Sequence, residues 1–477
     1  MLAQKITIEP VTRIEGHAKV TIHMNSEGTV DRAYLHINEF RGFEKFCEGR
    51  MYFEMPSITP RICGICPVSH HLASAKASDD LTGATPPKPA SLLRELMHMG
   101  QIIQSHGMHF FELAGPDLLL GFDAPAATRN VIGLIGLDPD LALKAINLRK
   151  FGQEVIRIVG GRRIHPNFAV PGGVNKALSV QERDTILSGV DDAIATIQVG
   201  IGLMKNWAEK NREDIDKFAV FSTGYFGLVN PENALELYDG TVRLTDSSGK
   251  QLEKFDGRKY LDYIAEHVES WSYLKFPYYK KFGFPNGVYR VGPLGRLNAS
   301  DKITTPLADA ELKIFKSLGK GHPVENTLYY HYARLIEALY ATENVKILCE
   351  DKDLLSTDIL NTKQEIRGEG VGVIEAPRGT LFHHYWTDQH GQLKRVNLIV
   401  STGHNNWAMC KAVDSVAKTY IQGPEIHEGL LNRVEAAIRA HDPCLSCSTH
   451  AVGQMPIEIR VVDPNGNELQ TISRPVS

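Results

Sequence analysis

Two short cysteine segments near opposite ends of the chain have the residue types of a metal site. Each is a Cys-x-x-Cys sequence followed closely by a histidine: Cys63, Cys66 and His70 in one, and Cys444, Cys447 and His450 in the other. Cysteines three positions apart can turn both sulfurs toward one ion, and two such pairs make a four-thiolate site. Because most of the chain separates the pairs, we expect a buried active centre rather than a local zinc ribbon.

The ligand types alone leave the metal open. Thiolate sulfur suits zinc, nickel and iron. A structural four-cysteine zinc site and a dithiol redox pair are therefore alternatives. The seven cysteines are too few for a disulfide scaffold. We expect the other three to be buried thiols: Cys47, Cys349 and Cys410.

Five ordered motifs resemble those of the large, catalytic subunit of nickel-iron hydrogenases, and most closely those of the cytoplasmic, bidirectional, NAD-linked type. They are Arg13-Ile14-Glu15-Gly16-His17, Arg41-Gly42-Phe43-Glu44, the Cys63 segment, Glu375-Ala376-Pro377-Arg378-Gly379 and the Cys444 segment. One Cys-x-x-Cys motif is a weak signal, whereas five in the family's order are specific. The resemblance implies the family's fold and the reversible oxidation of hydrogen at a nickel-iron centre.

The resemblance also implies a role for each cysteine. Cys63 and Cys444 would bind nickel terminally, and Cys66 and Cys447 would bridge nickel to iron. The iron would carry carbon monoxide and cyanide, leaving nickel with an open position for splitting hydrogen heterolytically.

By the same resemblance, five residues have catalytic roles: Glu15, Cys444, Arg378, Asp117 and Asp442. Cys444 would act as the base and pass its proton to Glu15. Arg378 would lie over the open metal position, with Asp117 and Asp442 as its carboxylate partners. The alternative for Glu15 is a carboxylate paired with Arg13.

Further residues would surround the centre. Pro377, Ser401 and Thr402 match the pocket of the diatomic ligands, with Thr402 donating to a cyanide nitrogen, and His70 would lie near a bridging sulfur. The resemblance implies a second metal, magnesium, which fits hard oxygen ligands and waters. Its protein ligands would be Glu44, the Leu398 carbonyl and His450.

The composition is that of an ordinary folded protein. The chain has 477 residues, of which 43% are hydrophobic and 23% charged, with a formal net charge of -4. We therefore expect no nucleic-acid partner. No long apolar run predicts a membrane span, and the first ten residues alternate like a strand rather than a secretion signal. We expect a cytoplasmic protein.

The periodicity predicts a mainly α (α+β) protein with a large helical core and small β hairpins near the N-terminus, in mid-chain and near the C-terminus. Hairpins are expected at 17–37, 241–255 and 457 onward, and a strand within 1–10. Helices are expected at 90–115, 141–159, 180–209, 308–318, 324–341 and 426–440, with a Ser179/Glu182 capping box. Residues 1–450 should form a single hydrogenase large-subunit domain.

The electrons must leave through other polypeptides, because the chain has no further cysteine motif for iron-sulfur clusters and no nucleotide-binding glycine motif. The resemblance implies an iron-sulfur small subunit and diaphorase subunits that carry FMN and bind NAD. It also implies nickel-insertion factors and an endopeptidase that removes residues 451–477 on maturation.

Two other classes of function stay open. One is a non-catalytic protein, either a complex I-like scaffold subunit or a structural zinc-binding protein; the presence of all four cysteines argues against the scaffold. The other is a hydrogen sensor with very low turnover.

Overall fold

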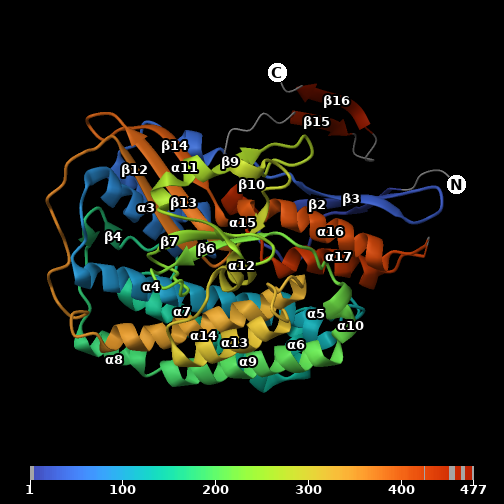
Figure 1. The fold of residues 1–477 in the computed structure, drawn as a ribbon, viewed down its shortest axis with the longest axis horizontal. Coiled ribbons are helices and arrows are strands. Elements are labelled where there is room, and N and C mark those ends of the chain that lie inside the picture. The colour runs from blue at the N-terminus through green and yellow to red at the C-terminus, as the bar shows by residue number, and fades with distance from the viewer. Residues whose placement is uncertain (1–4, 424, 451–456, 463–467, 475–477) are drawn as a thin grey trace.

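The computed structural model describes residues 5–423, 425–450, 457–462 and 468–474, with side chains up to 450. Helices account for 49% of the residues and strands for 19%, in several small sheets, which confirms the mainly α prediction. Figure 1 shows the long helices stacked in one layer, with the sheets on one side of it.

Four long helices form the core of the helical layer: α4 (Lys88–Met108), α7 (Pro139–Gly160), α9 (Val190–Lys210) and α14 (Tyr330–Glu350). Helix α4 packs against α7 and α14, and α14 packs against α9. Glycines bring α4 and α7 close together, since a Cβ on Gly152 would lie 2.6 Å from the Gly100 carbonyl oxygen. This contact requires the absence of a side chain at Gly152.

The predicted helix at 90–115 continues past its expected end. After α4 the backbone forms a π-helical turn, His109–Ala114, and continues into α5 (Gly115–Leu120), with Pro116 in its first turn. Proline is tolerated there because the first helical N–H groups have no intrahelical partner. The continuation buries Asp117 in the core.

Two other helix predictions need correction. The segment 180–209 is two helices, α8 (Val180–Leu187) and α9, which are separated at Ser188 and Gly189; a Cβ on Gly189 would lie 2.7 Å from the Phe151 ring. The Ser179/Glu182 capping box is present at α8. The helix expected at 324–341 begins later, at Tyr330, after a 3₁₀ turn over Thr327–Tyr329, and runs on to Glu350.

Helices α7, α13 (Pro306–Leu318) and α17 (Glu428–Ala440) lie within a few residues of their predicted bounds. The N-terminal hairpin is confirmed as β2 (Ala18–Met24) and β3 (Val30–Ile37), with β1 (Lys5–Ile8) alongside β2. The mid-chain hairpin is β7 (Thr241–Thr245) and β8 (Gln251–Phe255), in a sheet of order β11-β6-β7-β8 with β6 (Gly224–Val229) and β11 (Tyr289–Arg290). The C-terminal hairpin is β15 (Ile457–Val462) paired with β16 (Glu468–Arg474); its predicted turn, 463–466, lies outside the described residues.

A three-stranded antiparallel sheet was not predicted. It consists of β12 (Glu369–Ala376), β13 (Gly379–Thr387) and β14 (Leu393–Ile399). Strand β12 packs backbone to backbone on α3 (Pro67–Thr82): a Cβ on Gly372 would lie 1.9 Å from the Ala73 carbonyl oxygen. The sheet therefore fixes the β12–β13 turn, which contains Pro377 and Arg378, relative to the helix that follows Cys66.

The remaining elements are shorter. The helices are α1 (Phe43–Cys47), α2 (Met55–Ile58), α6 (Val131–Leu137), α10 (Arg212–Lys217), α11 (Tyr260–Tyr263), α12 (Gly292–Ala299), α15 (Ser401–His404), α16 (Asn406–Tyr420) and α18 (Leu445–Ser448). The strands are β4 (Ala169–Val170), β5 (Gly173–Val174), β9 (Ile264–His267) and β10 (Phe276–Tyr279).

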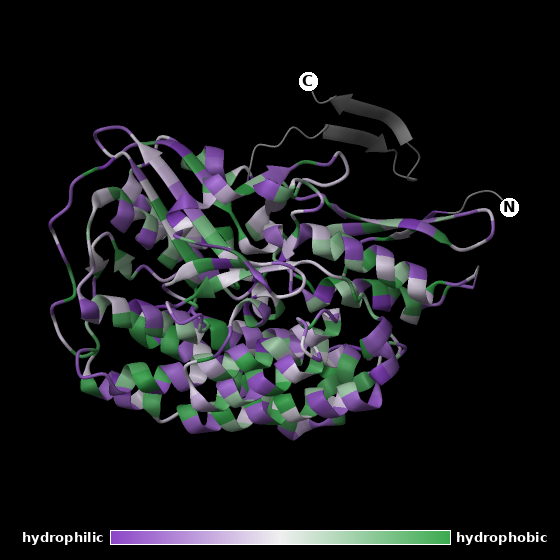
Figure 2. Ribbon diagram, viewed as in Figure 1, coloured by the Kyte–Doolittle hydropathy of each residue, from purple (hydrophilic) through white to green (hydrophobic). Residues whose placement is uncertain are grey.

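One stretch in the described part of the chain, Val180–Lys210, is long and apolar enough to cross a membrane, with a mean hydropathy of 1.4 over its most apolar window. The core helix of a globular protein passes the same test. Here the stretch is broken between α8 and α9, and α9 packs on α14 and α7. Hydrophobic and hydrophilic residues alternate around the helices of this layer (Figure 2), as expected for amphipathic helices that bury one face.

Candidate metal centre

The four motif cysteines meet in one buried cluster. Their sulfur atoms all lie within 4.8 Å of one another, with Cys63 Sγ 3.4 Å from Cys444 Sγ and Cys66 Sγ 3.4 Å from Cys447 Sγ. Each side chain is at most 4% exposed. A sulfur–sulfur distance of 3.4 Å is too long for a disulfide, which requires about 2.05 Å. The arrangement fits four ligands around a shared metal site.

Different elements deliver the two pairs. Cys63 follows a 3₁₀ turn (Thr59–Ile62), and Cys66 is the N-cap residue of α3, whose first residue is Pro67. Cys444 lies between α17 and α18, and Cys447 is in α18. The segment between α17 and Cys444 turns sharply, because Asp442 has a φ of 54°. Both pairs therefore sit at helix ends, where the backbone can turn the sulfurs inward.

The electrostatics of the cluster favour a bound cation. The amides of Ile65 and Cys66 donate to Cys63 Sγ at 3.2 and 3.4 Å. Hydrogen bonds from the other three cysteines hold the pKa of Cys63 well below its usual value, whereas burial raises the pKa of Cys444 and of Cys447 well above it. To bind a metal as thiolates the cysteines must lose their protons, and four buried thiolates need compensating positive charge, which the metal ion itself would supply.

Arg378 is buried beside the sulfurs with part of its guanidinium unpaired. Its Nη2 donates to Asp442 Oδ1 at 3.0 Å, while Nε and Nη1 have no hydrogen-bond partner among the described residues. Burial disfavours the charge, but Asp442 and the cysteines raise the pKa of Arg378, so it stays protonated. A fixed cation with two free donors fits a residue that faces an open ligand position.

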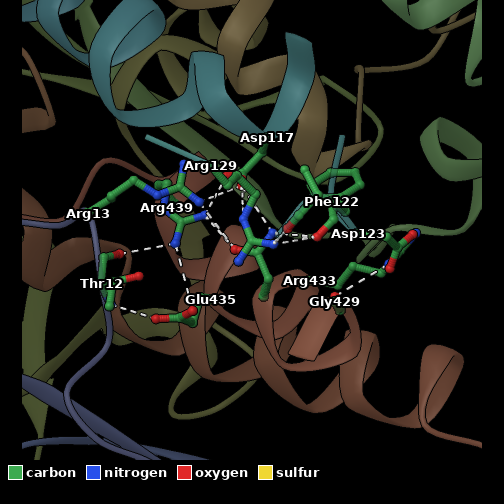
Figure 3. Close-up of polar contacts among 12 residues, drawn as sticks. Thr12, Arg13, Asp117, Phe122, Asp123, Arg129, Gly429, Arg433, Glu435 and Arg439 are labelled. Atoms are coloured by element: carbon green, nitrogen blue, oxygen red, sulfur yellow. Dashed lines mark hydrogen bonds and ion pairs between the residues drawn. The ribbon is translucent and has the colours of Figure 1, made fainter. Parts of the chain in front are cut away.

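The expected pairing of Asp117 with Arg378 is wrong. Asp117 Oδ1 instead accepts from Arg13 Nη2 at 2.5 Å, and Oδ2 accepts from Arg439 Nη1. The reason is positional: α5 carries Asp117 to the side of the site where residues 12–13 cross α17, as Figure 3 shows. Of the two expected carboxylate partners, Asp442 alone contacts Arg378.

Glu15 lies against the second cysteine pair. The Cys444 thiol donates to Glu15 Oε2 at 3.0 Å, and the Ser446 amide donates to the same oxygen at 3.1 Å. The Ser446 hydroxyl donates to Oε1, and the Leu445 amide donates to the Glu15 carbonyl at 3.0 Å. The alternative pairing with Arg13 is not found among the described residues, where Arg13 pairs with Asp117.

Of the predicted pocket residues, Thr402 contacts the second cysteine pair. Thr402 Oγ1 accepts from the Cys444 amide at 3.0 Å, which leaves its own proton free to donate elsewhere. Ser401 and Thr402 begin α15 and are almost fully buried. The Pro377 carbonyl accepts from Arg296 Nη2 at 3.2 Å.

His70 lies on α3, one turn after Cys66. Its Nδ1 is 3.1 Å from His383 Nε2, and burial lowers the pKa of His70 to about 4. The imidazole is therefore neutral at pH 7, and its hydrogen bond joins α3 to β13 behind the cysteine loop.

Of the predicted magnesium ligands, His450 has unpartnered ring nitrogens and Glu44 has a carboxyl group with a raised pKa. Glu44, in α1, accepts from the Leu398 amide at 2.7 Å, and burial raises the pKa of Glu44 to about 7. His450 is fully buried, and neither ring nitrogen has a hydrogen-bond partner among the described residues. Buried polar atoms rarely lack partners, so these residues fit a cation with its waters.

Sequence reasoning missed Arg296, which supports the Pro377–Arg378 turn. Arg296 Nη1 donates to Glu375 Oε2 at 2.6 Å and to the Ala376 carbonyl at 2.8 Å, and Nη2 pairs with Glu337 Oε2 at 2.6 Å. All three ionic side chains are fully buried. The only available signal was a set of charged residues in otherwise apolar segments, which does not identify partners.

Comparisons with known proteins identify the family of the chain. The profile described as nickel-dependent hydrogenase matches residues 41–129 and 229–450, and a HoxL-like profile matches residues 5–40. The beta subunit of the NAD-reducing hydrogenase HoxS of Cupriavidus necator is 45% identical over 99% of this chain and 100% of its own length. An F420-non-reducing hydrogenase subunit, from the vhu enzyme of Methanocaldococcus jannaschii, is 47% identical over 87% of this chain and 99% of its own.

Solved structures give the same result. The crystal structure of an NAD⁺-reducing [NiFe]-hydrogenase in the H₂-reduced state has a TM-score of 0.91 and 46% identity, covering 94% of this chain and 99% of that one. The Ni-Fe-Se hydrogenase of D. vulgaris Hildenborough, with a TM-score of 0.77 and 22% identity over 94% of this chain and 100% of that one, shares the fold. The chain therefore belongs to the nickel-dependent hydrogenase family of oxidoreductases and has the large-subunit fold of a nickel-iron hydrogenase.

Proposed function

We propose that this chain is the catalytic subunit that oxidises hydrogen reversibly, and that its electrons pass through partner subunits to NAD. The observation that carries the proposal is the meeting of Cys63, Cys66, Cys444 and Cys447 in one buried cluster. A cluster drawn from both ends of the chain, with a cation and a carboxylate beside it, is more than a structural zinc site requires.

The four cysteines would hold the nickel-iron centre, with Cys63 and Cys444 terminal on nickel and Cys66 and Cys447 bridging to iron. When bound, this centre supplies the open nickel position where hydrogen is split heterolytically. Pro377, Ser401 and Thr402 would line the pocket of the iron-bound carbon monoxide and cyanide. The free Thr402 proton supports its role as a donor to cyanide, because its oxygen already accepts from the Cys444 amide.

The proton would move from Cys444 Sγ to Glu15 Oε2. The two atoms are 3.0 Å apart, which is within the range required of a general acid–base pair. Two donors from Ser446 hold the Glu15 carboxylate in place. A carboxylate held this way loses little freedom on receiving the proton.

Arg378 would stabilise negative charge that develops above the sulfurs. Asp442 fixes one edge of the guanidinium through Nη2 and leaves two donor nitrogens, Nε and Nη1, without a partner among the described residues. A donor that is already oriented in a buried site needs no reorganisation during the reaction.

Magnesium would occupy the space beside Glu44 and His450, with the Leu398 carbonyl and waters completing its ligands. Two observations support this assignment: the raised pKa of Glu44 and the two unpartnered nitrogens of His450 among the described residues.

The electron partners belong to the same proposal. They are an iron-sulfur small subunit and FMN-containing diaphorase subunits, in a cytoplasmic complex. The relative from Cupriavidus necator is a subunit of an NAD-reducing hydrogenase, which supports NAD as the acceptor. We also propose that 1–450 is the mature domain, and that an endopeptidase removes 451–477 once nickel-insertion factors have acted.

The test is hydrogen-dependent reduction of NAD by the complex, produced together with its partner subunits and maturation factors. We expect NADH to form under hydrogen, and hydrogen to form from NADH without hydrogen. If the complex reduced an artificial dye with hydrogen but did not reduce NAD, NAD would be excluded as the electron acceptor, and the hydrogenase activity would still stand. Zinc in place of nickel, with no reaction of either kind, would contradict the whole proposal and favour a structural metal site.

A further inference from the structure

The segment that carries Glu15 is fixed by a buried ion cluster on its N-terminal side. Figure 3 shows three arginines, Arg13, Arg129 and Arg439, gathered around Asp117. Arg13 Nη2 and Arg439 Nη1 donate to the carboxylate, and Arg129 Nε lies 3.6 Å from Oδ1. Asn432 Nδ2 adds a fourth donor at 3.0 Å. One carboxylate thus organises donors from separate parts of the chain.

The cluster is buried and electrostatically tight. The side chain of Asp117 is 4% exposed and that of Arg439 is 1% exposed. Burial alone would raise the pKa of Asp117, but Arg439 and Arg13 lower it below its ordinary value. The carboxylate therefore stays ionised and cannot leave its partners without exposing unpaired charge to a low-dielectric environment.

Helix α17 also holds the backbone next to Arg13 on two sides. The Thr12 amide donates to Glu435 Oε1 at 2.6 Å, and the Thr12 carbonyl accepts from Arg439 Nη2 at 3.1 Å. Arg13 Nη1 donates to the Leu113 carbonyl at 2.7 Å, which ties the same segment to the π-helical turn. Arg13 itself has a φ of 53°, in the left-handed region, so its conformation depends on these contacts.

Two arginines of this cluster, Arg13 and Arg439, lie a few residues before the two residues that would exchange the proton. Glu15 follows Arg13 by two residues, and Cys444 follows Arg439 by five. Glu15 and Cys444 pair as a parallel β-bridge, in which the Leu445 amide donates to the Glu15 carbonyl. The cluster and the bridge therefore hold the same two segments together at neighbouring points.

Close packing leaves the Glu15 segment little freedom beyond the bridge. Gly16 has a φ of +86°, and a Cβ there would lie 2.8 Å from Leu445 Cβ and 2.7 Å from Glu39 Oε2. A small displacement at Arg13 is thus transmitted to the Glu15 carboxylate rather than absorbed by a loop. Proton transfer is sensitive to such displacements, because it requires hydrogen-bond distance.

We propose that Asp117, through Arg13 and Arg439, is a positioning residue that holds the Glu15 carboxylate against Cys444 and thereby sets the rate at which protons leave the site. This inference rests on the proposed hydrogenase function, since it concerns the proton released there. It assigns Asp117 to the proton side of the site rather than to Arg378.

The test compares Asp117→Asn with Asp123→Asn in the assembled complex. Asp123 is a suitable control because it also pairs with an α17 arginine, Arg433, at 2.6 Å, but its side chain is 59% exposed. Exchange of deuterium gas with protons of the solvent, measured without an electron acceptor, reports proton exit separately from electron transfer. For Asp117→Asn we expect this exchange to slow by about tenfold or more, because the proton-transfer group is misplaced. We also expect the solvent isotope effect on kcat to rise and KM for hydrogen to stay unchanged.

Two measurements and one further variant distinguish a positioning role of Asp117 from a role in folding and from failure of the proposed function. Infrared bands of the metal centre should stay unshifted in Asp117→Asn, which shows that the site is assembled. In the metal-free chain, hydrogen exchange of the Thr12 and Leu445 amides should quicken in Asp117→Asn and not in Asp123→Asn. Arg13→Lys, which keeps the charge but loses the forked contacts, should give the same changes to a smaller degree if Asp117→Asn fails to fold.

A lowered melting temperature with unchanged gas exchange and unchanged isotope effect would overturn the inference and leave Asp117 a purely structural residue. Equal effects of Asp117→Asn and Asp123→Asn would also overturn it. Absence of gas exchange in the unmodified complex would contradict the proposed function itself, independently of any variant.

Discussion

Glu15 is the residue on which the proposed proton transfer depends, because its carboxylate alone among the described acidic groups accepts from a motif cysteine. The sequence could supply its identity through the Arg-Ile-Glu-Gly-His motif, but not its partners. Ser446 donates to Glu15, and Arg13 pairs with Asp117 instead of Glu15. Both features depend on the tertiary structure, which brings the two ends of the chain together.

Replacing Glu15 with glutamine should leave the centre assembled but slow turnover. The amide keeps the shape and can still accept from Ser446, yet it cannot take a proton from Cys444. We expect kcat for hydrogen oxidation to fall about 10²- to 10⁴-fold, the usual contribution of a general base. Dye-linked hydrogen uptake measures this, with Glu9→Gln, an exposed carboxylate near the same segment, as a control of unchanged activity. Full activity in Glu15→Gln would assign proton exit to another group.

Replacing Arg378 with lysine should keep the charge and lose the directed donors. Because the guanidinium bonds Asp442 and presents two further donor nitrogens in a fixed plane, lysine cannot do both. We expect kcat/KM for hydrogen to fall about 10²- to 10³-fold, as for the loss of one oriented donor. Arg258→Lys, in an exposed ion pair, should change nothing measurable. If kcat/KM for hydrogen fell equally in Arg378→Lys and Arg258→Lys, that result would contradict the role assigned to Arg378.

At the scale of elements, the sequence predicted the helices and strands that have a regular apolar pattern. It missed those that depend on tertiary packing. The N-terminal and mid-chain hairpins and helices α7, α13 and α17 follow their apolar patterns. Strands β12 and β13 pack on α3 and are buried along most of their length, so they lack the alternation of a half-exposed sheet. Gly189, between α8 and α9, packs against a distant residue, Phe151, which no local pattern reveals.

The contact between β12 and α3 gives a prediction about stability. Gly372→Ala would place a methyl group 1.9 Å from the Ala73 carbonyl oxygen, so helix and strand must separate. We expect a loss of about 3 kcal/mol or more in the free energy of unfolding, measured by chemical denaturation, together with lower metal loading at Cys66. Gly202→Ala, in α9 with open space around it, should instead raise stability by up to about 1 kcal/mol. If the two variants changed the free energy of unfolding equally, that result would contradict the packing described here.

At the scale of the whole molecule, the fold brings together a site that no single segment contains. The motifs predicted the four cysteines and most neighbouring residues, because their chemistry requires particular residue types. They could not predict that Asp117 pairs with Arg13 and Arg439, since a buried carboxylate is satisfied equally well by any nearby arginine. The same holds for Arg296 and its two glutamates.

Two partly buried carboxylates remote from the metal site should make stability depend on pH. Burial and neighbouring acids raise the pKa of Glu95 to about 7 and that of Glu236 to about 8. Because the folded state holds these protons more tightly than the unfolded state, their stabilisation is fully present below about pH 4.5 and is lost progressively as the pH rises to about 8. Glu236→Gln should therefore raise the melting temperature at about pH 9 relative to the unmodified chain, and less so at about pH 6. An equal effect at both values would contradict the shift.

The most direct test of the central claim is infrared spectroscopy of the purified, mature complex combined with metal analysis of the same sample. The claim is that cysteines from the two ends of one chain hold a single nickel-iron centre. We predict one nickel and one iron per chain and sharp carbon monoxide and cyanide bands, both abolished in Cys447→Ser. Stoichiometric zinc without nickel, and no such bands, would contradict it.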